Sequence, residues 1–191
     1  MDHLETLIIK CIREDEIAQR RLYSRFAPLL FGICMRFAKN RQEAEDILQE
    51  GFIKIFKNLK TFRNEGVLEA WMRRVIINTA INLYKKKIPN FQDIDFERWK
   101  NRGVKNDAID NLSHAEIMKF IQELPHGYRV VFNMNVIEGY THKEISEKLN
   151  ISVNTSKSQL SRARKVLQNK ISKNLNRSLE SDNLLPELLV S

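Results

Sequence analysis

The residues of this chain best suited to binding chemistry are the cations between Ser152 and Leu179, a segment without a single carboxylate. They are Lys157, Arg162, Arg164, Lys165, Lys170, Lys173 and Arg177. Short polar side chains near the start of a helix can approach base edges, and longer cations reach phosphates. The periodicity turns Asn154, Lys157, Ser158, Ser161, Arg162 and Lys165 outward. We therefore predict that this segment is a DNA-binding helix.

A second basic segment runs from Trp71 to Lys87 and also lacks acids. Its cations are Arg73, Arg74, Lys85, Lys86 and Lys87. The whole chain of 191 residues has a formal net charge of +8 and a pI near 9.5. Such a balance fits a nucleic acid, an anionic membrane, or a soluble protein that is merely basic. Two separate acid-free segments favour two contacts with one long polyanion.

The elements immediately before the basic segment 152–179 form, together with it, the pattern of a helix-turn-helix. Thr141 and Glu144 have the spacing of a capping box, which begins a short helix carrying Ile145 and Leu149. Asn150 tolerates the left-handed turn, and Ser152 can cap the next helix. The predicted inner face of that helix is Val153, Ser156, Leu160, Ala163 and Leu167. The alternative is an amphipathic helix with a solvated basic face, but the capped preceding helix and the absence of acids favour DNA binding.

Helical periodicity governs the rest of the chain, and Gly and Pro number only 6 and 4. A first helix is predicted over 4–12. A second is predicted to begin after a cap at Asp15 and to break or restart at Pro28. Two more are predicted over 42–59 and 68–87. The inner side of the last is predicted to hold Trp71, Val75, Ile76, Thr79, Ala80 and Leu83. We expect an all-α fold of two small helical domains joined by a flexible linker. The predicted boundaries are 1–88, linker 89–112, helix-turn-helix domain 113–173 and tail 174–191.

Several classes of protein are disfavoured. The four histidines have no metal-ligand spacing, and no carboxylate cluster or nucleophile–base set is present, so we expect neither an enzyme nor a metal or other cofactor. Cys11 and Cys34 are expected to be reduced core residues rather than a disulfide framework. No signal peptide begins the sequence, and no run approaches the roughly 18 apolar residues of a membrane span. A cytoplasmic protein without membrane insertion is expected.

Motifs in the second domain resemble the promoter-binding C-terminal domain of bacterial RNA polymerase sigma factors, in the small extracytoplasmic-function group. They are Leu124-Pro125, Arg129-Val130-Val131-Phe132, Glu138-Gly139, Glu144-Ile145, Leu149 and Ser161-Arg162-Ala163-Arg164. The first domain agrees independently. Its segment 44–50 resembles the helix that docks on the polymerase clamp, and Phe62-Arg63, Trp71 and 78–80 resemble the part that melts and reads the −10 element.

The resemblance implies three binding surfaces. Core RNA polymerase would contact Asp46, Gln49 and Glu50, which share one helix face. The −10 DNA would contact Phe62, Arg63, Asn78, Thr79, Asn82, Lys85 and Lys86. The −35 DNA would contact Asn154, Thr155, Lys157, Ser158, Ser161, Arg162 and Lys165. It also implies promoter DNA and an anti-sigma factor as partners, and a monomer when free.

Local alternatives remain open. The acids of 43–50 could simply complement a helix dipole, Asn78 could be a solvated surface residue, and Trp71 suits a core position better than a wedge into DNA. Ser156 departs from the family, which usually carries an aliphatic residue there, so looser packing is expected. At the level of the whole protein, the alternative is a regulator that binds duplex DNA without joining polymerase, which would need a sensor or dimerisation domain in the first half.

Overall fold

The computed structural model describes residues 3–62, 66–87 and 113–184, and every regular element within them is helical. The predicted all-α fold is confirmed. The chain divides into two compact units, Met1–Pro89 (unit 1) and Asn90–Ser191 (unit 2). The linker predicted at 89–112 and the residues from 185 onward lie outside the described residues. No helix in the described part is long and apolar enough to cross a membrane.

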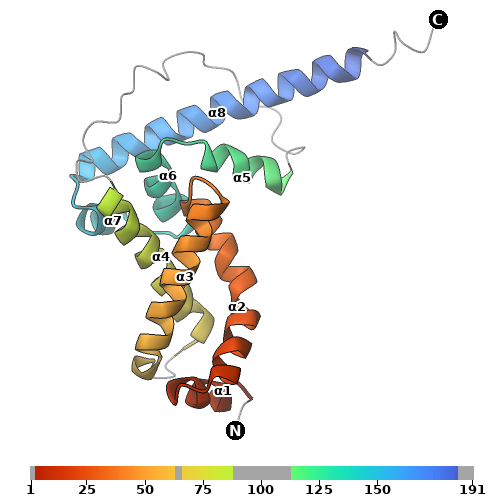
Figure 1. The fold of residues 1–191 in the computed structure, drawn as a ribbon. Coiled ribbons are helices and arrows are strands. Elements are labelled where there is room, and N and C mark those ends of the chain that lie inside the picture. Colours follow the sequence, from red (N-terminus) through yellow and green to blue (C-terminus); the bar gives the residue numbers. More distant parts are fainter. Residues whose placement is uncertain (1–2, 63–65, 88–112, 185–191) are drawn as a thin grey trace, which may run out of the picture. The chain divides into compact units, whose positions relative to one another are not determined.

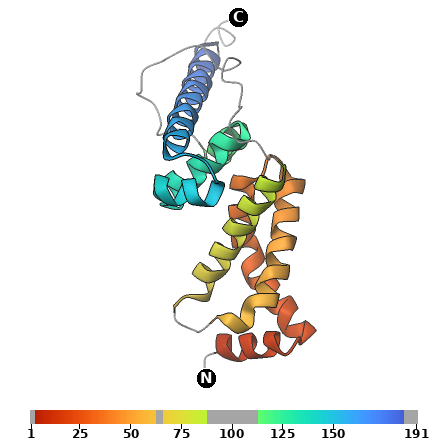
Figure 2. The same cartoon turned by 90° about the vertical axis from the view of Figure 1, so that its left-hand side faces the viewer.

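Unit 1 contains α1 (His3–Ile12), α2 (Glu16–Phe37), α3 (Arg41–Asn58), the 3₁₀ turn η1 (Leu59–Thr61) and α4 (Leu68–Lys87). Helices α2, α3 and α4 pack against one another, and α1 lies across one end of this bundle against α2 and η1 (Figure 1, Figure 2). Asp15 caps α2 by accepting from Ala18 N at 2.8 Å, and Asn40 caps α3 by accepting from Glu43 N at 2.9 Å. The predicted cap at Asp15 is confirmed.

The apolar stripe of α3 is buried throughout. Its members are Ala44, Ile47, Leu48, Gly51, Phe52 and Ile55, and Leu59 continues it into η1. Cys11 and Cys34 are also buried and free, as predicted. Burial raises the pKa of the Cys11 thiol to about 11, with a smaller contribution from Asp15, and that of Cys34 to about 12. Both sulfurs therefore stay protonated and belong to the core.

Pro28 lies inside α2, although the sequence favours a break there. The predicted break is wrong because the proline ring lies on the exposed side of the helix. The Ser24 carbonyl, which loses its N–H partner, can be solvated on that side. Ala27 and Leu30 on the other side are buried, so packing carries the helix through the missing hydrogen bond.

The buried side of α4 is broader than predicted. Ile76, Thr79 and Ala80 are buried as expected, whereas Trp71, Val75 and Leu83 are only half-buried. Because α4 packs against both α2 and α3, its core sector is completed by Leu68, Met72, Ile77, Ile81 and Tyr84. The opposite side of α4 is more exposed.

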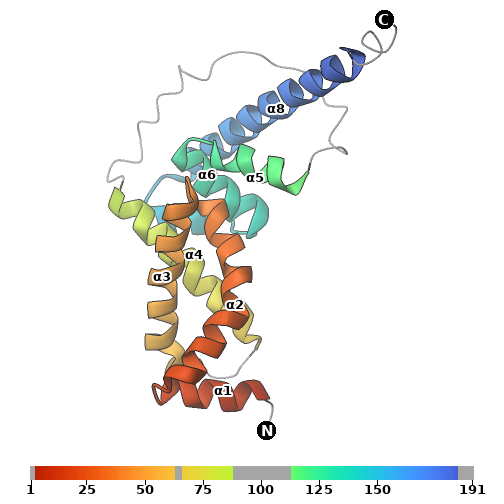
Figure 3. The same ribbon diagram turned by 45° about the vertical axis from the view of Figure 1, so that its right-hand side comes forward.

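Unit 2 contains α5 (His114–Gln122), α6 (His126–Phe132), the π-helical turn η3 (Asn133–Ile137), α7 (His142–Leu149) and α8 (Val153–Leu184). Helices α5, α6 and α7 pack against α8, which continues beyond them (Figure 3). Ile121, Leu124, Tyr128, Ala163, Val166 and Leu167 form the core. The buried Arg129 joins α5 to α6, because its Nη1 donates to the Gln122 carbonyl at 2.5 Å.

Helix α8 passes the predicted end of its domain without interruption, so residues 174–184 are helical. Two contacts tie its middle to α5. The Lys170 ammonium pairs with the Glu123 carboxylate, and Asn174 Nδ2 donates to Glu116 Oε1 at 3.1 Å. These contacts extend the support of α8 beyond the apolar core.

Replacing Gly51 tests how closely α3 approaches α4. A Cβ at this position would collide with Cδ1 of the fully buried Ile76. Overpacking of about 1–3 kcal/mol should outweigh the roughly 1 kcal/mol by which alanine favours a helix, so Gly51→Ala should destabilise unit 1. Gly32→Ala in α2 is the matched control, because its Cβ would meet nothing within 4 Å. It should stabilise α2 by about 0.5–1 kcal/mol. Hydrogen exchange of α2, α3 and α4 measures both, and unchanged or slower exchange in Gly51→Ala would contradict the packing.

Candidate functional site

The helix-turn-helix is positioned by its caps. Thr141 Oγ1 accepts from Glu144 N at 3.2 Å, and the Thr141 N–H donates to Glu144 Oε2 at 2.8 Å, which completes the predicted capping box. Asn150 ends α7 in the left-handed conformation at φ 56°. Ser152 Oγ then accepts from Thr155 N at 2.9 Å and begins α8. Every predicted cap is confirmed, so local chemistry sets the three-residue turn between α7 and α8.

The predicted DNA-facing residues of α8 all reach its surface. Asn154, Lys157, Ser158, Ser161 and Lys165 are exposed, and Thr155 and Arg162 are half-buried. The inner face differs at three positions. Val153 is 37% exposed rather than internal, whereas Gln159 and Val166 are buried at 4% and 5% exposure. One side of α8 is therefore a cationic and hydroxyl-bearing surface.

A hollow of about 510 Å³ lies where this surface meets the start of α7. We call it the basic hollow; its lining includes His142, Lys157, Ser161, Arg164, Lys165 and Gln168. None of its lining residues is acidic, so its electrostatic potential favours an anion. His142, Arg164 and Gln168 are absent from the predicted DNA contacts. The position of Arg164 one turn after Ser161 could have indicated it, whereas no pattern marks His142.

Ser156 does not loosen the packing as predicted. It is fully buried, and its Oγ lies 2.9 Å from Nδ1 of His142. The serine hydroxyl thus has a polar partner on the facing helix, which satisfies a group that would be costly to bury alone.

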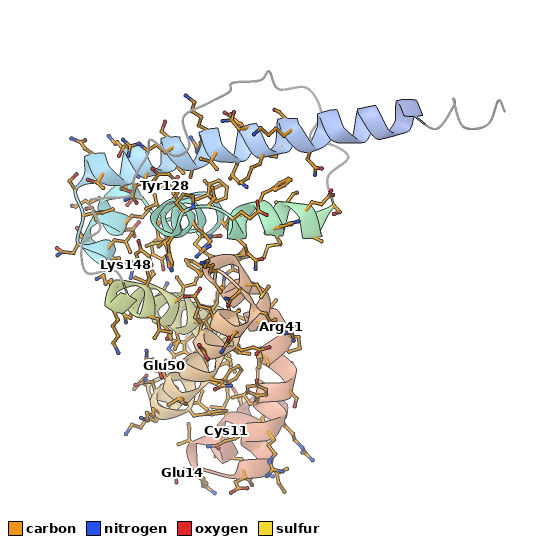
Figure 4. The ribbon with its side chains drawn as sticks, turned by 45° about the horizontal axis from the view of Figure 1, so that its top comes forward. Cys11, Glu14, Arg41, Glu50, Tyr128 and Lys148 are labelled. Carbon is orange, nitrogen blue, oxygen red and sulfur yellow. The ribbon has the colours of Figure 1, made fainter. Side chains whose placement is uncertain are left out.

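Unit 1 carries a separate acidic face on α3, formed by Asp46, Gln49 and Glu50. Asp46 and Gln49 are exposed, and Glu50 is half-buried with its Oε1 3.2 Å from Lys54 Nζ. Asp46 forms no ion pair with any described residue. Figure 4 shows Glu50 on a different side of unit 1 from Arg41. The Nε atom of Arg41 lies 2.8 Å from Oε1 of Glu45, so these two residues form a separate ion pair. Ile53 is 50% exposed one turn further along, so an apolar residue that the sequence prediction omits adjoins the acidic face.

The more exposed side of α4 carries a polar stripe. Trp71, Arg74, Asn78, Asn82 and Lys85 follow one another at spacings of three and four, opposite the buried sector. Asn82 and Lys86 are exposed, while Asn78 and Lys85 are half-buried. The predicted −10 residues Asn78, Asn82, Lys85 and Lys86 therefore all reach the surface of α4.

At the start of this stripe lies an aromatic cleft of about 340 Å³, whose lining includes Thr61, Phe62, Val67, Ala70, Trp71 and Arg74. The Phe62 and Trp71 ring centroids are 5.7 Å apart and the ring planes are inclined at 48°. Trp71 thus belongs to a surface cleft rather than to the core. Tilted aromatic faces beside a guanidinium suit the stacking of a planar group.

One predicted −10 residue is not in this surface. Thr79 is 1% exposed, and its Oγ1 donates to the Val75 carbonyl at 2.8 Å, so its side chain packs inside unit 1 and offers nothing to DNA. The predicted contact from Thr79 is therefore corrected. Arg63 lies outside the described residues. Within the described residues, no group of three or more histidines, cysteines or carboxylates is arranged to hold a metal ion.

Two protein families match parts of this chain. Sigma-70 region 2 matches residues 22–89, and Sigma-70, region 4 matches residues 114–167. The chain is 27% identical over 180 residues to an ECF RNA polymerase sigma-E factor of Haemophilus influenzae, covering 87% of this chain and 94% of that protein. It is 29% identical over 185 residues to the ECF RNA polymerase sigma factor SigW of Bacillus subtilis, covering 88% and 98%.

A solved structure of the sigma factor RpoE in complex with the anti-sigma factor NepR from Bartonella quintana is also similar. It has a TM-score of 0.49 and 20% sequence identity, and the match covers 80% of this chain and 96% of that one.

The capping box predicts an acid-sensitive start to α7. The backbone N–H of Thr141, and then its hydroxyl, hold the pKa of the Glu144 carboxyl below its ordinary value of 4.5. A lowered pKa in the folded state means that this stabilisation is present above the ordinary pKa and is lost as the pH falls through the folded value. The backbone amides of α7 should therefore exchange hydrogen faster in Glu144→Gln than in the wild type at pH 7. This difference in exchange rate should become smaller as the pH is lowered toward 3. Glu147→Gln, which removes a charge from α7 but no cap, is the control. A difference that persists at low pH would contradict the cap.

Proposed function

The chain belongs to the extracytoplasmic-function group of RNA polymerase sigma factors, and we propose that its two units divide the work of promoter recognition. It binds core RNA polymerase and directs initiation at specific promoters. In the proposed division, unit 1 docks on core and opens the −10 element, and unit 2 holds the −35 element. The observation that carries this division is that region 2 matches within unit 1 and region 4 within unit 2, in that order.

For core binding we assign the acidic face. The exposed Asp46 forms no ion pair with the described residues, so little must be broken before it meets a cation on a partner. Glu50 would exchange Lys54 for that partner at small cost, because exposed pairs contribute only about 0.2–1 kcal/mol. The half-exposed Ile53 supplies an apolar contact beside these charges. A basic surface of core polymerase is the expected counterpart.

For the −10 element we assign the aromatic cleft together with the stripe on α4. A base leaves its stack at a cost of a few kcal/mol, and stacking on Phe62 or Trp71 would offset about 1–3 kcal/mol of it. Asn78 and Asn82 each offer donors and acceptors to base edges. Lys85 and Lys86 would contact the phosphates of the same strand. What supports this assignment is that the stripe lies along one side of α4 and the aromatic cleft lies at its start.

For the −35 element we assign the outer side of α8. Asn154, Ser158 and Ser161 lie near the first turns, where a recognition helix approaches base edges. Lys157, Arg162 and Lys165 would reach the backbone phosphates, which fix register without reading sequence. The absence of acids from 152 to 179 means that no carboxylate in this part of the helix opposes the approach of DNA.

The remaining partners follow from family membership. An anti-sigma factor is the expected antagonist, and the free protein is proposed to be a cytoplasmic monomer, because polymerase and promoters lie in that compartment. We propose that the chain supplies no catalytic group and that polymerase performs the chemistry. The alternative of a regulator acting apart from polymerase gains no support, since region 2 lies where such a protein would need a sensor or dimerisation domain.

Core association tests the acidic face. Replacing Asp46 and Glu50 together by alanine should weaken binding to purified core polymerase by about tenfold, or roughly 1.4 kcal/mol, because two charges facing the partner are lost. Fluorescence titration of labelled protein with core measures the change. The double variant Glu16→Ala with Glu69→Ala removes two exposed carboxylates elsewhere in unit 1 and should bind normally. Equal binding by both double variants, with unchanged helical content, would refute the assignment.

A further inference from the structure

His142 and Ser156 form a polar link between the two helices of the helix-turn-helix. His142 is the first residue of α7, and Ser156 lies in the first turn of α8 at a position that is completely buried. Their Nδ1 and Oγ atoms are 2.9 Å apart. An aliphatic side chain at position 156 would pack there without orienting the histidine. The link therefore gives the imidazole a defined orientation that packing alone would not supply.

The link leaves the other ring nitrogen available. Because Nδ1 faces Ser156, Nε2 is directed away from it, and His142 is also part of the basic hollow lining. A serine hydroxyl can donate or accept. When the hydroxyl donates to Nδ1, the neutral ring carries its hydrogen on Nε2, and this arrangement presents an Nε2–H donor. When the hydroxyl accepts from Nδ1–H, only a ring with hydrogens on both nitrogens presents that donor. An anion beside Nε2 favours the arrangements in which Nε2 carries a hydrogen.

The surroundings of this donor select an anion. Lys157, Ser161, Arg164 and Gln168 follow one another along the same side of α8, at spacings of four, three and four. The first-turn acid of α7, Glu144, is bound by Thr141 and is not part of the lining. Two cations, a hydroxyl and an amide thus converge with the imidazole on one hollow without a competing carboxylate.

We propose that the basic hollow is a seat for one DNA backbone phosphate and that His142 donates from Nε2 to a phosphate oxygen. The proposal rests on the −35 role of unit 2. In a helix-turn-helix the first helix crosses the DNA backbone while the second enters the major groove, so a phosphate is expected at the junction of the two. Ser156 is then a positioning residue, since it acts through His142. The seat fixes the register of α8 on the duplex and reads no base.

The test measures binding of the full chain to a short duplex of random sequence at low salt, by fluorescence anisotropy. His142→Asn places its amide near the position of Nδ1 and can keep the contact with Ser156, but it lacks Nε2. We expect about fivefold weaker binding with an unchanged unfolding transition. His142→Gln carries an amide donor near the position of Nε2 and should recover part of the loss. Lys119→Ala on α5 removes an exposed charge outside the hollow and should leave binding unchanged.

Coupling between the two residues separates positioning from simple contact. Ser156→Val should also weaken binding by about fivefold. The double variant His142→Asn with Ser156→Val should bind no more weakly than either single variant, because both substitutions remove the same contact between His142 and phosphate. Additive losses, or wild-type affinity in His142→Asn, would overturn the phosphate seat alone. A wild-type chain that does not bind duplex DNA would overturn the −35 role as well, and core association would remain a separate question.

Discussion

The structure of unit 2 depends on the burial of one side of α8. The part of α8 up to Leu179 carries several cations and no acid and repels itself, and its own hydrogen bonds do not offset that repulsion together with the entropy of ordering. Leu160, Ala163, Val166 and Leu167 bury that side against α5, α6 and α7. The same packing decides which side remains outside. The cations are therefore presented together because the apolar residues are spaced at helical period, and the proposed DNA-binding surface is a consequence of the core.

In unit 1, burial of an apolar side likewise determines which charged residues remain exposed, the acids on α3 and the cations on α4. The close approach of α3 to α4 at Gly51 buries the apolar side of each, so the acids of α3 and the cations of α4 point to different surroundings. Carboxylates placed beside the α4 stripe would neutralise it and repel a phosphate chain. In the proposed function, separation on different helices would let one small bundle meet a basic partner and a nucleic acid at once. In this account the division of charge follows from packing.

Much of this could be predicted, because caps and stripes are encoded by neighbouring residues. The capping box at Thr141 and the left-handed Asn150 need only local spacing. Three failures have different origins. Trp71 was assigned to the core, since the periodicity of α4 alone does not show which side two helices cover. Thr79 was assigned to the DNA surface by the family resemblance, although the periodicity of α4 places it on the inner side, where it is buried. His142 has no local pattern and gains its role only when the fold brings Ser156, fourteen residues later, against it.

The central claim is that unit 1 and unit 2 act together as one promoter-recognition factor on polymerase. The most direct measurement is run-off transcription with purified chain and core polymerase on fragments of the source genome. The account predicts discrete transcripts that begin at a small set of sites, require the chain, and share two upstream sequence elements at a fixed separation. Stable association with core accompanied by initiation no different from that of core alone would contradict it.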